Sequence, residues 1–157
     1  MKRIILYIGI LAALLAAPVE RADVGKLRPV QAVYIYKEKD WFVLETDTDD
    51  LGIGATAEQA LRNLKDTTAG IIYLDTAEYL LLSKDAQEAA EELREELKDS
   101  VRLCLMAQKV DMKEAAKYLS AHGDLPKLES WKTGQELPVI SGFGERITFL
   151  KKVENSA

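Results

Sequence analysis

The sequence is poor in the residues from which catalytic and metal sites are usually built. It contains one cysteine, Cys104, and one histidine, His122, among 157 residues. A single cysteine cannot form an internal disulfide. One histidine without a cysteine cluster cannot build a zinc or iron site. We therefore predict no cofactor, a buried and inert thiol at Cys104, and a histidine whose charge suits the end of a helix.

Nucleophile and phosphate motifs are also missing. No G-x-S-x-G occurs, since the run ISGFG places Ser141 before the glycines, and GFGERI has too few glycines for a phosphate loop. The remaining enzymatic alternative is a small secreted hydrolase with Cys104 as the nucleophile and His122 as the base. Cys104 lies between Leu103 and Leu105 in an alternating segment, where burial makes a thiolate costly. We therefore favour a non-enzymatic protein.

Basic residues are too few for a surface that binds nucleic acid. Lysine and arginine number 21 against 26 acidic residues, so the formal net charge is -5. Nucleic acids and anionic membrane surfaces both attract clustered lysine and arginine. We predict no nucleic-acid partner and no membrane contact through the folded surface.

Long apolar runs are absent except near the start of the chain. Lys2 and Arg3 precede an unbroken apolar run at residues 4–17, which Pro18 follows. This run is typical of a secretion signal and is shorter than the roughly 20 residues of a spanning helix. We expect a signal peptide or signal anchor at residues 1–22, one domain at 23–152 and a polar tail at 153–157. The domain would then be secreted, or tethered to the cytoplasmic membrane by an uncleaved segment 4–17.

Apolar periodicity predicts an α+β fold. Alternating runs indicate strands, and spacings of three and four indicate helices. The predicted order is β-β-α-β-α-β-α-β-β, a mixed sheet that begins and ends with a hairpin. The predicted elements are a hairpin at 30–46, helices at 56–69, 84–99 and 111–122, strand segments at 71–74, 79–82 and 101–107, and a hairpin at 137–150.

An acidic stretch, DTDDLGIGATAE at residues 47–58, resembles a calcium loop. Asp47 and Asp49 occupy positions 1 and 3, and Glu58 occupies position 12. Position 5 is Leu51, which offers no side-chain oxygen, and a predicted strand enters the stretch where an EF-hand has a helix. We interpret 47–58 as an acidic turn followed by the entry of a helix, and keep a calcium-dependent module as an alternative.

Three aromatic residues alternate on one side of the first hairpin. Tyr34, Tyr36 and Trp41 share that side with Ala32 and Val43. The small and β-branched neighbours favour a place in the core. An exposed aromatic strip that binds a partner is the alternative.

One long run resembles the N-terminal domain of the C-subunits of spore germinant receptors, the Ger(x)C lipoproteins. The likeness covers roughly residues 22–120 and begins at a G-x-T-x-x-x-A-L-x-x-L helix. The matching positions are Gly54, Thr56, Ala60, Leu61, Leu64, Tyr73, Leu74, Leu80 to Ser83, Arg102 and Leu103. The lipid-bearing cysteine of that family has no counterpart here, because Pro18 and Val19 follow the apolar run.

The resemblance implies a fold and a location but no catalytic residue, because its motifs are structural. Together with the apolar run, it predicts an extracytoplasmic domain of a Gram-positive, spore-forming lineage. We expect this domain to bind an unknown protein or small ligand at the cell envelope, with a possible relation to germination.

Overall fold

The computed structural model describes residues 26–122, 124–143 and 146–151. The predicted signal segment 1–22, the polar tail 153–157 and Gly123, the predicted end of the third helix, lie outside this range. Within the described ranges, none of the helices combines the length and the apolar character needed to cross a membrane.

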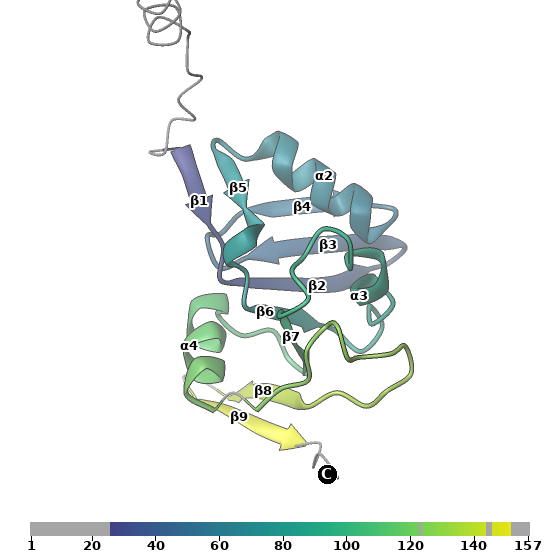
Figure 1. The fold of residues 1–157 in the computed structure, drawn as a ribbon, viewed down its shortest axis with the longest axis vertical. Coiled ribbons are helices and arrows are strands. Elements are labelled where there is room, and N and C mark those ends of the chain that lie inside the picture. Colours follow the sequence, from purple (N-terminus) through teal and green to yellow (C-terminus); the bar gives the residue numbers. More distant parts are fainter. Residues whose placement is uncertain (1–25, 123, 144–145, 152–157) are drawn as a thin grey trace, which may run out of the picture.

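A seven-stranded mixed sheet forms the centre of the molecule (Figure 1). Its four middle strands are parallel, and antiparallel hairpin strands flank them at both edges. In spatial order the strands are β4 (Leu51–Gly54), β3 (Trp41–Thr46), β2 (Ala32–Glu38), β6 (Tyr79–Leu82), β7 (Arg102–Met106), β8 (Val139–Phe143) and β9 (Arg146–Lys151). A separate two-stranded parallel sheet pairs β1 (Leu27–Pro29) with β5 (Ile71–Tyr73).

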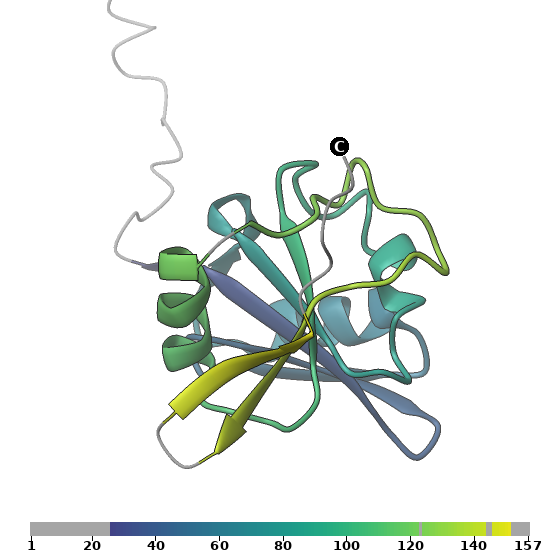
Figure 2. The same ribbon diagram turned by 90° about the horizontal axis from the view of Figure 1, so that it is seen from below.

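Helices cover both faces of the large sheet (Figures 1 and 2). Successive side chains of a strand point to opposite faces. Leu80, Leu82 and Leu103 therefore pack with α2 (Ala57–Thr67) and α3 (Ala89–Glu92). Leu81 and Cys104 pack on the other face with α4 (Met112–His122). Two hydrophobic cores result, one on each side of the sheet.

The predicted α+β class and most predicted elements are confirmed. The first hairpin turns at Lys39, whose φ of 58° lies in the left-handed region. Thr56 accepts a hydrogen bond from the backbone N–H of Gln59 at 3.1 Å, which is one half of the capping box at the start of α2. Two short strands, β1 and β4, were not predicted, and β4 falls within the stretch interpreted as a turn and helix entry.

The predicted helix at 84–99 is wrong in length, although its buried residues are correct. Only α3 is α-helical in that segment, and the rest forms turns in which N–H groups bond carbonyls three residues earlier, as from Ala86 to Ser83 and from Glu96 to Leu93. The apolar residues of the predicted stripe are all buried. Glutamates four residues apart disfavour a regular helix here, and one such pair bonds to α2 instead: Glu92 accepts from the N–H of Ala57 and Glu96 from Lys65, each at 2.7 Å.

The loop before β8 contributes the second tryptophan of the chain to the core. Trp131 is 1% exposed and belongs to the core beneath α2 and α3. Its indole N–H donates to the carbonyl of Gln135 at 3.2 Å. The Arg94 guanidinium donates to the carbonyls of Leu128 and Trp131, which joins this loop to the segment after α3.

Two glycines on β4 allow α2 to lie directly against the sheet. A Cβ atom on Gly52 would come within 2.7 Å of the Leu64 Cβ, and one on Gly54 within 2.6 Å of the Gln59 Cβ. Such distances are far below van der Waals contact, so only glycine fits at both positions. The alternation in L-G-I-G therefore places glycine toward α2 and large aliphatic side chains on the opposite face.

We predict that Gly52→Ala lowers the free energy of unfolding by about 3 kcal/mol, because the added methyl group forces α2 away from β4. Urea denaturation measures the change. Gly134→Ala is the matched control: its φ is 89° and nothing lies within 4 Å of the added atom. The control therefore loses only the backbone term of about 1 kcal/mol. Equal losses in both variants would contradict the close packing of α2.

Candidate functional site

Cys104 and His122 do not form a nucleophile and base pair. Cys104 is fully buried on β7, and its thiol donates to the carbonyl of Pro138 at 3.3 Å. Burial raises the pKa of this thiol to about 12. His122 ends α4, where its Nδ1 lies 2.9 Å from the Tyr118 carbonyl and its ring stacks on Tyr118. Each group is bonded to a different neighbour, so the geometry gives no support to the hydrolase alternative.

Two carboxylates of the calcium-loop pattern, Asp47 and Asp49, lie in the turn between β3 and β4, the third, Glu58, lies on α2, and the two aspartates have different partners. Asp47 accepts the backbone N–H groups of Gln31 and Ala32 at 3.0 and 3.2 Å. Asp49 forms an ion pair with Lys113 of α4 at 3.0 Å. Glu58 belongs to the first turn of α2, beyond the extended strand β4. In the ranges that the structure describes, no three histidine, cysteine or acidic side chains are grouped to hold a metal ion.

The predicted aromatic strip divides into a buried part and an exposed part. Tyr34 is 5% exposed and stacks on the half-buried Tyr36, with ring centroids 5.1 Å apart. Lys109 lies 5.5 Å above the ring of Tyr36 and forms an ion pair with Glu45. Trp41 is 52% exposed. Tyr34 therefore lies in the core, as the first interpretation expects, and Trp41 lies on an exposed surface, as the alternative expects.

Trp41 belongs to an apolar surface on β3 and β4, the two strands at one edge of the large sheet. Leu51 and Ile53 of β4 are 45% and 47% exposed. The register pairs Val43 with Ile53 and Glu45 with Leu51, so Trp41, Leu51 and Ile53 share the sheet face that carries Tyr34. We call Trp41, Leu51 and Ile53 the open face. The helix on this side of the sheet, α4, packs with β2, β6 and β7 and leaves these three side chains exposed.

The free edge of β4 is closed to strand addition next to the open face. The backbone N–H of Ile53 donates to the side-chain oxygen of Asn63 in α2 at 3.0 Å. Because this outward N–H is already bonded, a partner strand cannot pair there without displacing the Asn63 side chain. A partner would instead contact the flat face of β3 and β4.

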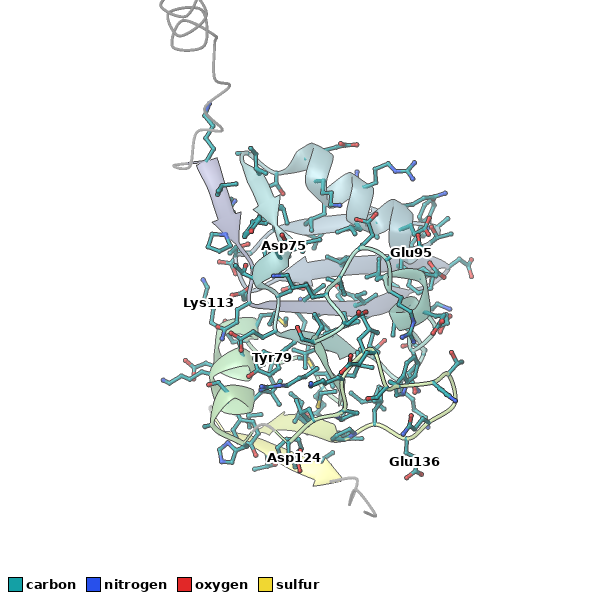
Figure 3. The ribbon with its side chains drawn as sticks, in the orientation of Figure 1. Asp75, Tyr79, Glu95, Lys113, Asp124 and Glu136 are labelled. Atoms are coloured by element: carbon teal, nitrogen blue, oxygen red, sulfur yellow. The ribbon has the colours of Figure 1, made fainter. Side chains whose placement is uncertain are left out.

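A second feature is a crevice at the carboxyl ends of β6 and β7, with a volume of about 760 Å³. Residues that follow β6 form one wall: Ser83, Lys84, Asp85 and Gln87. The opposite wall comes from the loop before β8, including Gln135 and Glu136, and Figure 3 shows Glu136 on that loop. Leu105 and Val139 line the crevice as register partners on β7 and β8.

A hollow of similar volume beside the start of α4 has a different character. Most of its charged groups are bonded within the protein, Glu45 to Lys109 and Asp49 to Lys113, and Glu114 is the exception among the described lining residues. Asp111 accepts the N–H of Glu114 at 3.0 Å and so caps α4. These acids stabilise the fold and offer little unpaired charge to a ligand.

No family model, curated protein or solved structure matches this chain. The features of this chain that bear on function are therefore the open face and the crevice. Sequence reasoning missed Leu51 and Ile53, although their alternation with Gly52 and Gly54 is a strand signal. The crevice residues carry no local motif, because they meet only through the order of the strands.

We predict that Cys104 resists alkylation in the folded protein, because its thiol is buried and protonated at pH 8. Iodoacetamide labelling followed by mass spectrometry should give no adduct in buffer and one adduct in denaturant. Ser120→Cys, at an exposed position of α4, provides the control and should add one rapidly labelled thiol. Rapid labelling of Cys104 in buffer would contradict its burial.

Proposed function

We propose that this protein is a non-enzymatic domain that acts outside the cytoplasmic membrane and binds a partner protein through the open face. The observation that carries the proposal is the exposure of Trp41, Leu51 and Ile53, each about half exposed, on adjacent strands. Contiguous exposed apolar side chains mark interaction sites, and tryptophan is enriched among the residues that dominate binding energy.

The charge around the open face indicates the chemistry of the partner. Glu38, the register partner of Trp41, is exposed, while the exposed Lys39 and Asp40 at the hairpin tip offset each other and Lys37 pairs with Glu88. A partner with an apolar centre and a basic group at its rim, opposite Glu38, complements this arrangement. A second copy of the chain would bring like charges together, since the formal net charge is -5. We therefore propose a different protein rather than a homodimer.

The extracytoplasmic location is proposed from the sequence. Lys2 and Arg3 followed by the apolar run 4–17 favour export. The resemblance to the N-terminal domain of germinant receptor C-subunits supports an envelope role in a spore-forming, Gram-positive lineage. Two positions of that likeness have structural tasks here: Gly54 admits α2 and Thr56 caps it. They support a shared fold and leave the relation to germination as a proposal.

We predict that a photo-crosslinking residue at position 53 traps a partner protein at the envelope of the native host. The same residue at position 58, on the exposed start of α2, should trap none. Adding Trp41→Ser should abolish the adduct at position 53, because the apolar contact is lost. Its free energy of unfolding should fall by about 2 to 3 kcal/mol, because about half of the indole is buried, and circular dichroism should show that the variant remains folded.

Three results would contradict the proposal for the open face. These are no adduct at position 53, an adduct that contains only two copies of this chain, and an adduct that persists in the Trp41→Ser variant. The adduct should also weaken as salt rises, because the proposed rim contact is electrostatic.

We predict that the domain is accessible to external protease in cells stripped of their wall and is protected in inverted vesicles. Mass spectrometry of the recovered protein shows whether residues 1–17 have been removed. A cleaved chain should appear in the soluble exported fraction, and a retained segment should keep the protein with membranes. Protease resistance until the cells are lysed would contradict export.

A further inference from the structure

The crevice lies where the chain leaves two neighbouring parallel strands toward opposite faces. The segment after β6 packs its apolar residues beneath α2 and α3, while α4 after β7 packs on the other face. In open sheets, ligands bind outside the carboxyl ends of strands at such a switch of direction. The volume of about 760 Å³ falls within the range of small-molecule sites.

The floor of the crevice is aliphatic and remains partly exposed. Leu105 and Val139 are direct register partners, and both are half-buried. Leu137, on the loop before β8, is nearly fully buried beside them. Burial of apolar area is favourable, so this floor suits the hydrocarbon part of a ligand.

One end of the crevice carries an exposed carboxylate and a buried phenol. Asp85 accepts the hydroxyl of Ser83 through Oδ1 at 2.5 Å, which leaves Oδ2 available. Among the hydrogen bonds of the described residues, the Tyr34 hydroxyl takes part in none, although Tyr34 is only 5% exposed. Burial, followed by the fields of Tyr36 and Asp85, raises the pKa of Tyr34 to about 12. The phenol therefore stays neutral near a negative charge.

Acidic side chains outnumber basic ones on the remaining walls. The amide nitrogen of Gln87 donates to the carbonyl of Lys84 at 2.9 Å, so its oxygen is left to accept, whereas the amide oxygen of Gln135 accepts the N–H of Lys132 at 3.3 Å and its amide nitrogen is left to donate. Asp85 and Glu136 contribute two carboxylates against the one ammonium group of Lys84 among the described lining residues. A group with several N–H donors and a positive charge complements this set.

We propose that the crevice binds a small organic cation, a primary ammonium group on an aliphatic chain. The ammonium group would donate to Asp85 Oδ2 and the Tyr34 oxygen, and the chain would cover Leu105 and Val139. This site is separate from the open face, so either can fail without affecting the other.

Saturation-transfer NMR on the full-length chain, kept in detergent micelles because of the apolar run 4–17, tests the proposal, with the micelles alone as the blank. The probes are pentylammonium, pentan-1-ol and pentanoate, which share a chain and differ in charge. Pentylammonium should bind most tightly and pentanoate least. Asp85→Asn should weaken pentylammonium binding at least about tenfold, the loss expected for a hydrogen bond to a charged group, and leave pentan-1-ol unchanged.

Two further variants separate the crevice from the rest of the surface. Ala107→Trp, at an exposed lining position, should block all three probes without changing the buried core. Glu58→Gln removes an exposed acid on α2 and should alter none of them. Equal binding of pentanoate and pentylammonium, an unchanged affinity in Asp85→Asn, or no saturation transfer from the chain beyond the blank would each overturn the proposal.

Discussion

The contact between α2 and β4 is the constraint on which this side of the molecule depends. Gly52 and Gly54 let the helix reach the sheet backbone, and a side chain at either position would separate them. The same alternation turns Leu51 and Ile53 to the opposite face, where none of the described helices covers them. The close packing of α2 on the sheet and the exposure of the open face are therefore two consequences of the L-G-I-G pattern of β4.

Side-chain bonds between distant segments join the other connections to that contact. Glu92 after β6 caps the first turn of α2, and Glu96 pairs with Lys65 at its last turn. The acidic run that cannot sustain a long helix thus positions the segment beneath α2. Because the next connection leaves on the other face with α4, the two segments diverge and the crevice opens between them.

Local signals were enough for much of the fold and for little of the candidate site. Residues close together in the sequence determine the alternating strands β2 and β3 and the helix cap at Thr56. These features are all present in the structure. The helix predicted at 84–99 is different. Its apolar residues are buried as expected, but most of the segment forms turns, and side chains of the segment bond to distant residues. The crevice was beyond reach for the same reason: Tyr34, Asp85 and Val139 meet only once the strand order is known.

The two tryptophans have opposite environments, so the intrinsic fluorescence of the protein reports on two different regions. Trp131 is enclosed between the helices and the sheet, while about half of Trp41 faces solvent. Emission from Trp131 thus follows the integrity of the core, whereas soluble quenchers reach Trp41 first. Occupation of the open face would shield the quenchable component and leave the other unchanged, so unfolding and association can be told apart in one fluorescence spectrum.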